Sequence, residues 1–229
     1  MPNTPNTLLI AVPSDIEWRA LWPEMPFVLW KAQKIGKYCD AVLTGIGKAN
    51  AAAGTVAAFD PARHCGFISI GIAGSLPTSG LALGDVIAAS ASVLADEGID
   101  TPTGYQTCAA MGFAQIGESD TADGHRTWVE FLAERGCSVG VVATVSTCSG
   151  TDARANAIVR QFSARAEAME GAAVGLAAFR LGVPFVEVRV VSNTTGDRDR
   201  QVWQMQAALD RLGSVAQLVF DLPCAHDRT

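Results

Sequence analysis

The sequence predicts a single α/β domain built on a mainly parallel or mixed sheet. Short apolar runs, typical of buried strands, alternate with segments of helical periodicity along the chain. Several of these runs end in a glycine-containing turn that leads into a helix, which is the order expected of strand–helix–strand units. With 229 residues, of which 49% are hydrophobic, the chain is long enough to bury one substantial core and short for two. We therefore expect one domain spanning residues 1–229.

Each expected strand is a short apolar run followed by a turn signal. Pro13 ends the first run, and glycine-rich turns follow the second and third. The last run is nearly continuous in apolar residues, which is typical of a buried strand in the interior of a sheet. The expected strands are 8–12, 41–43, 67–70, 86–93, 139–145 and 185–193.

The expected helices show the 3.6-residue apolar period, and several have start or stop signals. Ser14 is a suitable cap for the first, and Gly182 and Pro184 end the fifth. Residues 96–123 are rich in Gly, Thr and Asp and predict a loop with room for one hairpin. The tail from Pro223 is expected to fray. The expected helices are 14–21, 51–59, 126–135, 152–162, 172–181 and 201–219.

Composition excludes several classes of partner and site. The net charge of -6 and the lack of any Lys/Arg run argue against nucleic acid. No apolar run is long enough to span a bilayer, and the start lacks the basic flank of a leader, so we expect a cytoplasmic protein without membrane contacts. Six cysteines without a Cys-x-x-Cys and three separated histidines argue against a zinc site or a disulfide framework, and favour free thiols.

The polar pair Ser192-Asn193 ends the most apolar strand and marks a candidate site. Sheets of this class bind ligands at the carboxyl ends of their strands. The alternative is a plain polar turn, because Ser, Asn, Thr and Gly continue to residue 196. The position of the pair favours function.

Other motifs have structural explanations of similar weight. Ser14-Asp15-Ile16-Glu17 fits a capping box, which local sequence alone favours over a functional Glu17. Glu170 precedes a helix, where a carboxylate complements the helix dipole. Gly45-Ile46-Gly47-Lys48 lacks the third glycine and the later acidic residue of a dinucleotide fingerprint, so NAD binding is rejected. Arg198-Asp199-Arg200 has the pattern of a solvated charge run.

Taken together, five motifs resemble the nucleoside phosphorylase/nucleosidase superfamily in residue type and order. They are Gly45-Ile46-Gly47-Lys48, Gly71-Ile72-Ala73-Gly74, Leu83-Gly84-Asp85, Ala168-Met169-Glu170-Gly171 and Val188-Arg189-Val190-Val191-Ser192-Asn193. The resemblance covers most of the chain and implies a three-layer α/β/α fold with a mixed central sheet. Within the superfamily the chain looks most like futalosine hydrolases, through residues 187–199 and Trp203. The related methylthioadenosine/S-adenosylhomocysteine nucleosidases have aspartate in place of Asn193 and glutamate in place of Ala168.

The resemblance implies hydrolysis of an N-ribosidic bond, with futalosine split into hypoxanthine and dehypoxanthine futalosine for menaquinone biosynthesis. Glu17 would activate water, Met169 and Glu170 would hold the ribose, and Asn193, assisted by Ser192, would hold the leaving base. An asparagine suits hypoxanthine, because it offers both a donor and an acceptor to O6 and N7. Further substrate contacts are expected from Ile72, Gly74, Cys148 and Ser149.

The benzoate end of futalosine requires a cation, for which Arg198 and Arg200 are candidates, with Trp203 as a ring partner. Tyr105 and Phe113 are expected to cover the pocket, from a neighbouring subunit if the protein forms the homodimer or higher homo-oligomer usual among its relatives. Neither a cofactor nor a metal is implied.

Three alternatives remain open on the sequence. The chain could cleave another purine nucleoside, such as 6-amino-6-deoxyfutalosine, methylthioadenosine or S-adenosylhomocysteine. It could instead be a purine nucleoside phosphorylase that binds phosphate through Arg19 and the segment Gly71-Ile72-Ala73-Gly74-Ser75, although Glu17 would repel the anion. It could also be a nucleoside-binding protein that kept the fold without the activity.

Overall fold

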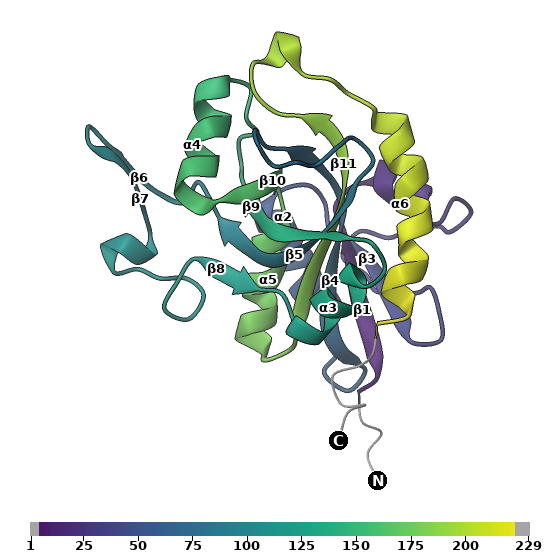
Figure 1. The fold of residues 1–229 in the computed structure, drawn as a ribbon. Helices are drawn as coiled ribbons and strands as arrows, with labels where there is room; N and C mark the ends of the chain where they lie inside the picture. The colour runs from purple at the N-terminus through teal and green to yellow at the C-terminus, as the bar shows by residue number, and fades with distance from the viewer. Residues whose placement is uncertain (1–4, 223–229) are drawn as a thin grey trace.

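A nine-stranded mixed sheet runs through the centre of the molecule (Figure 1), as expected from the sequence. The structure is a computed structural model, and residues 5–222 are described. The strands of this sheet are β1 (Thr7–Val12), β2 (Gln33–Lys34), β3 (Cys39–Leu43), β4 (His64–Ser75), β5 (Val86–Leu94), β8 (Thr121–Asp123), β9 (Ser138–Thr144), β10 (Ala164–Ala168) and β11 (Phe185–Thr194). Their order is β10-β9-β5-β11-β4-β1-β3-β2, with β8 beside β5.

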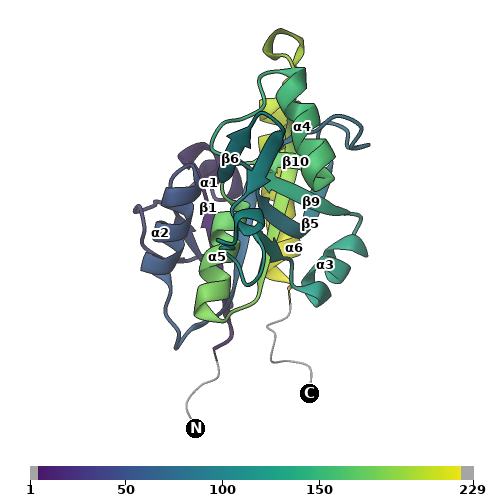
Figure 2. The ribbon, with the colours of Figure 1, turned by 90° about the vertical axis from the view of Figure 1, so that its left-hand side faces the viewer.

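Helices cover both faces of the sheet, which gives the three-layer arrangement (Figure 2). The helices are α1 (Asp15–Leu21), α2 (Lys48–Ala58), α3 (Arg126–Ala133), α4 (Asp152–Phe162), α5 (Gly171–Leu181) and α6 (Met205–Phe220). Alternate residues of β1 separate the layers. Leu8, Ile10 and Val12 pack with α1, α3 and α6, whereas Leu9 and Ala11 pack with α2 and α5.

The parallel pair β4 and β11 positions the candidate site. The two strands run side by side from Phe185, opposite Phe67, to Val191, opposite Ala73. A register shift after Val191 then places Asn193 opposite Gly74. Such an irregularity re-aims side chains at the end of a strand. The carboxyl ends of β1, β4, β10 and β11 meet at this edge, where ligands bind in open α/β sheets.

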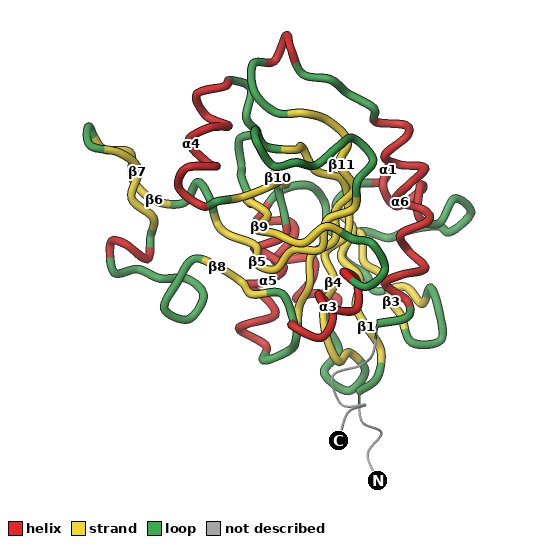
Figure 3. The backbone as a smooth tube through the Cα atoms, in the orientation of Figure 1, coloured by secondary structure: helices red, strands yellow, loops and turns green. Residues whose placement is uncertain are grey.

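Strand β10 and the start of the last helix differ from the expectation. Strand β10 was not expected, because Arg165 and Glu167 break its apolar pattern, yet it pairs with β9 and β4. The last helix begins at Met205 and not at residue 201, since Trp203 forms a bridge with Asn193. The long loop contains the expected hairpin, β6 (Gly98–Thr101) and β7 (Gly104–Thr107), which projects from the body (Figure 3). The tail from Pro223 lies outside the described residues.

Of the five cysteines within residues 5–222, four are free thiols, as expected. Cys39, Cys108, Cys137 and Cys148 are free. Cys65 is disulfide-bonded, so the prediction of a free thiol is wrong at that position. The prediction was made from the spacing of cysteines in the sequence, which does not show which cysteines lie close together in the fold. Within residues 5–222, no helix is long and apolar enough to cross a membrane.

Candidate active site

A cavity of about 450 Å³ lies at the carboxyl ends of the central strands. Most of the site residues expected from the sequence line it, although they come from segments far apart in the chain. They are Glu17, Ile72, Gly74, Cys148, Met169, Glu170, Ser192, Asn193 and Trp203. Ser149, Arg198 and Arg200 do not line it. The volume is that of a site for one small ligand.

The carboxylate of Glu17 faces this cavity from the first turn of α1. Ser14 caps the helix by accepting a hydrogen bond from the Glu17 amide at 3.3 Å. The side chain of Glu17 does not complete the expected capping box. One of its oxygens accepts from the Ile72 amide at 2.9 Å, and the other accepts from the Ser14 hydroxyl. Burial raises the pKa of Glu17 from its ordinary value of 4.5, which makes the carboxylate a stronger base.

Glu170 lies at the N-terminus of α5, and its carboxylate also turns into the cavity region. The Gly47 amide donates to Glu170 Oε1 at 3.0 Å, and Arg189 Nη1 is 3.3 Å from Oε2. The Thr144 hydroxyl, and not Glu170, accepts from the Ala172 amide in the first turn of α5. The carboxylate is therefore held by contacts with other segments of the chain rather than by its own helix end.

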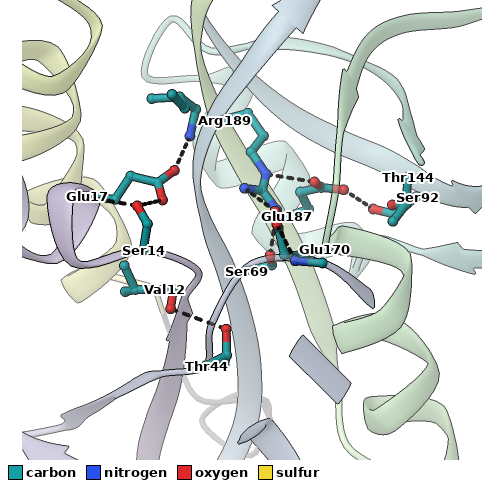
Figure 4. A network of polar contacts seen from close by, with 12 residues as sticks. Val12, Ser14, Glu17, Thr44, Ser69, Ser92, Thr144, Glu170, Glu187 and Arg189 are labelled. Atoms are coloured by element: carbon teal, nitrogen blue, oxygen red, sulfur yellow. Dashed lines mark hydrogen bonds and ion pairs between the residues drawn. The ribbon is translucent and has the colours of Figure 1, made fainter. Parts of the chain in front are cut away.

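A buried ionic cluster that sequence reasoning did not assign to the site supports these two acids (Figure 4). Arg189 and Glu187 on β11 are fully buried. Arg189 donates from Nε to Glu187 at 2.7 Å and from Nη2 to the Ser69 hydroxyl at 2.9 Å. Its Nη1 has no hydrogen-bond partner among the described residues. Two charged residues inside an apolar strand were a usable signal, because buried charges require partners.

Gly71 marks the point where Glu17 and Arg189 come together. A Cβ added there would lie 2.5 Å from Arg189 Nη1 and 2.6 Å from Glu17 Oε1. Arg189 Nη1, which also lies 3.3 Å from Glu170 Oε2, and the Glu17 carboxylate thus face the same small space beside β4.

Asn193 lines the cavity from the end of β11. Its Nδ2 donates to the Thr194 carbonyl at 3.0 Å, and its Oδ1 accepts from the Ser192 hydroxyl at 2.8 Å. Gly74 lies so close that an added Cβ would be 3.1 Å from Asn193 Nδ2. The amide therefore has a fixed orientation, and one N–H and part of the oxygen's capacity are available for a ligand.

Glu167, which sequence reasoning missed, also lines the cavity. Ser149 holds both of its oxygens, with the amide at 2.7 Å and the hydroxyl at 2.6 Å. Burial raises the pKa of Glu167. Ser149 therefore contacts Glu167 and does not line the cavity, unlike the direct substrate contact expected from the sequence. The sequence signal for this strand is weak, because the charged residues Arg165 and Glu167 alternate only with alanines.

The structure separates the two arginines expected near the substrate tail. The Arg198 guanidinium lies over the Trp203 ring, with 5.0 Å to the centroid, and donates to Gln201. Arg200 instead forms ion pairs with Asp152 and Asp197, away from the cavity lining. Trp203 lines the cavity and is 44% exposed, so Arg198 stands at its rim.

Tyr105 and Phe113 do not line the cavity of their own chain. Phe113 is 72% exposed. Their expected role across a subunit interface remains a prediction, as does the homo-oligomer.

Comparison with known proteins identifies the family. Residues 32–221 match the model of the phosphorylase superfamily. A futalosine hydrolase of Acidothermus cellulolyticus is 38% identical over 176 residues, which is 76% of this chain and 71% of that protein. A futalosine hydrolase of Streptomyces coelicolor is 37% identical over 191 residues, 79% of each. The chain belongs to the futalosine hydrolase family of the phosphorylase superfamily.

Solved structures of nucleosidases share the fold of this futalosine hydrolase family member. The S-adenosylhomocysteine nucleosidase of Streptococcus pyogenes has a TM-score of 0.77 at 24% identity, covering 97% of this chain and 100% of that one. The 5'-methylthioadenosine/S-adenosylhomocysteine nucleosidase of S. pneumoniae has a TM-score of 0.75 at 22% identity, covering 93% and 96%. The expected three-layer nucleosidase fold is confirmed, and family membership makes the chain a hydrolase of N-glycosidic bonds.

Proposed function

We propose that the protein hydrolyses the N-ribosidic bond of futalosine and releases hypoxanthine and dehypoxanthine futalosine, as a step of menaquinone biosynthesis. The observation that supports this most is that Glu17, Glu170 and Asn193, far apart in sequence, line one cavity. The relatives named futalosine hydrolases support the choice of substrate. The mechanism follows from what each of the three side chains offers a nucleoside.

Glu17 is the base that activates water. In an inverting displacement, water attacks the anomeric carbon on the face opposite the leaving base and loses a proton to a carboxylate. Glu17 has both oxygens fixed by hydrogen bonds, and its burial raises its pKa above the ordinary 4.5. Nη1 of Arg189 lies beside it, ion-paired with Glu170 but without a hydrogen bond among the described residues, and can donate to the water's lone pair.

Glu170 and Met169 bind the ribose. Glu170 lies between Gly47 and Arg189, which fix its carboxylate as an acceptor for the sugar hydroxyls. Hydrogen bonds to a 2-hydroxyl strengthen as positive charge develops on the ring in an oxocarbenium-like transition state. Met169 lines the cavity beside it and supplies an apolar surface for the sugar.

Asn193 holds the leaving base and selects its chemistry. Its amide presents an N–H and an oxygen, which match the O6 acceptor and the protonated N7 of hypoxanthine. A carboxylate at this position would face O6 with charge of the same sign. Such mismatches discriminate strongly, because they leave buried polar groups unpaired. Ser192 keeps the amide oriented by donating to its oxygen.

Arg198 and Trp203 bind the benzoate end of futalosine at the rim of the cavity. The rim is apolar on the other side, where Ile16 and Ile46 line the cavity and are more than half exposed. Trp203 provides an aromatic surface for the ring, and Arg198 a cation for the carboxylate. Arg200 is already neutralised by two aspartates and does not take part.

The arrangement disfavours a phosphorylase. Arg19, the cation that would bind phosphate, is exposed and lies over the Phe27 ring, outside the cavity lining. The carboxylate of Glu17 lies beside Gly71 and Ile72 and would repel a phosphate dianion. Water is therefore the nucleophile that this site accommodates.

A substrate panel tests the proposal. The purified protein is incubated separately with futalosine, 6-amino-6-deoxyfutalosine, inosine and methylthioadenosine, and the liberated bases are identified by chromatography. We expect futalosine to give the highest kcat/KM, with hypoxanthine as the base. A preference for methylthioadenosine, or cleavage of inosine as efficient as that of futalosine, would contradict the proposed substrate.

A further inference from the structure

Glu187 is a completely buried carboxylate for which the reaction described above has no role. It lies on β11, two residues before Arg189, and does not line the cavity. Arg189 Nε donates to its Oε1 at 2.7 Å, and the Ser92 hydroxyl on β5 donates to its Oε2. It is the carboxylate with the shortest contact to the buried arginine, since Glu170 is at 3.3 Å.

The cluster around Arg189 contains one positive charge and three carboxyl groups. The charged and titratable side chains facing the arginine in the described structure are Glu17 from α1, Glu170 from the start of α5, and Glu187 from β11. Ser69 of β4 and Ser92 of β5 add neutral hydroxyl groups. A carboxylate that alone balances a buried guanidinium becomes a weak base, because the opposite charge stabilises its ionised form. The carboxylate that forms the strongest ion pair with Arg189 therefore determines how basic the other two carboxylates remain.

Gly171 provides the space that Glu187 occupies. A Cβ added at Gly171 would overlap the carboxylate carbon and both oxygens of Glu187. The backbone of Gly171 does not have a left-handed conformation that would by itself favour glycine. Residue 171 is therefore a glycine because the Glu187 carboxylate packs against it. Gly171 and Glu187 are complementary in size.

We propose that Glu187 is a positioning residue for hydrolysis: it holds Arg189 with Nη1 facing Glu17, and it takes up the arginine's charge so that Glu17 stays free to accept a proton from water. This inference rests on the proposed role of Glu17. Glu187 acts through Arg189 and does not touch the substrate.

The charge component is tested by a titration that does not depend on activity. In protein labelled with ¹³C at glutamate carboxyl groups, the Glu17 signal is assigned by its loss in Glu17→Gln and followed with pH. Glu187→Gln keeps the size of the side chain and removes its charge. We expect the pKa of Glu17 to fall by about one unit in this variant, because the uncompensated guanidinium then favours the ionised form. Glu130→Gln, which removes an exposed carboxylate on α3, is the control and should leave the Glu17 titration unchanged. An unaltered Glu17 titration in Glu187→Gln would overturn the proposal.

The positioning component is tested by rates. Glu187→Gln should lower kcat about tenfold or more, with the acidic limb of the kcat profile moved to lower pH by the same amount as the Glu17 titration. Glu187→Asp keeps the charge but withdraws the carboxylate from Arg189, so kcat should fall while the acidic limb stays near its wild-type pH. If Glu187→Gln does not fold, Glu187→Asp serves as the test. A wild-type kcat in Glu187→Asp would refute the proposal that Glu187 positions Arg189. Failure of the proposed function looks different, since Glu17→Gln would then remain hydrolytically active.

Discussion

Gly71→Ala perturbs the site at the point where the proposed base and its arginine meet. The added Cβ would lie 2.5 Å from Arg189 Nη1 and 2.6 Å from Glu17 Oε1, which is 0.8 to 0.9 Å less than the 3.4 Å at which ordinary contact begins. Gly71 is not in a left-handed conformation, so its backbone accepts alanine without strain. The substitution therefore acts by displacing these two side chains.

The size of the effect follows from that displacement. A misplacement of about 1 Å in a reacting group costs about 100-fold in rate, so we expect kcat to fall about 100-fold. Overpacking at a buried position costs about 1–3 kcal/mol of stability. The atoms nearest to the new methyl group belong to Arg189 and Glu17 and not to Asn193 or Glu170, so the affinity for unreacted nucleoside should change little.

The assay compares kcat, substrate affinity and the free energy of unfolding with those of Gly36→Ala. At Gly36 an added Cβ would have Cys39 Cβ at 3.8 Å as its nearest neighbour, so this control should match the wild type in all three. Retention of more than about a third of wild-type kcat by folded Gly71→Ala would show that the position of Glu17 and Arg189 does not limit the reaction.

Three further predictions concern the choice of leaving base, the binding of the benzoate end of the substrate, and the pH dependence of kcat. Asn193→Asp should lower kcat/KM on futalosine relative to its 6-amino analogue, measured as base release from each; an unchanged ratio of the two would remove Asn193 from base selection. Arg198→Glu should raise the KM for futalosine about tenfold, equivalent to about 1.4 kcal/mol. Arg200→Glu should leave the KM unchanged, because Arg200 is already paired with Asp152 and Asp197. Equal effects of the two substitutions would show that the benzoate end of futalosine does not bind at Arg198. Burial raises the pKa of Glu17 above 4.5, and the ionised form is the active one, so kcat should fall as the pH is lowered through a value above 4.5. A kcat that does not change between neutral pH and pH 4.5 would exclude Glu17 as the base.

The strand and helix order could be predicted from local pattern, because the central strands are apolar runs between turn signals. The run 185–193 became β11, and the expected helix 152–162 became α4 with the same bounds. Strand β10 could not be found in this way. Its pairing with β9 and β4 provides the stability that its alternating charged residues obscure in the sequence.

Local pattern indicated the Ser192-Asn193 pair at the end of a strand, whereas the other candidate site residues were expected only through resemblance. Locally, Ser14 and Glu17 looked like a capping box, and nothing in the sequence shows that Glu17 turns towards the Ile72 amide 55 residues later. The roles of Glu187 and Arg189 depend on contacts between neighbouring strands and the start of α5. Arg198 and Arg200 are indistinguishable by sequence, and only their partners in the fold separate them.

The most direct test of the central claim is the release of hypoxanthine from futalosine in phosphate-free buffer by the wild type and by Glu17→Gln, with the affinity of each for unreacted futalosine measured in parallel. We predict rapid release by the wild type, unaffected by added phosphate, and at least 100-fold slower release by Glu17→Gln with its affinity for futalosine retained. Release that requires phosphate, or wild-type turnover by Glu17→Gln, would contradict water activation by Glu17.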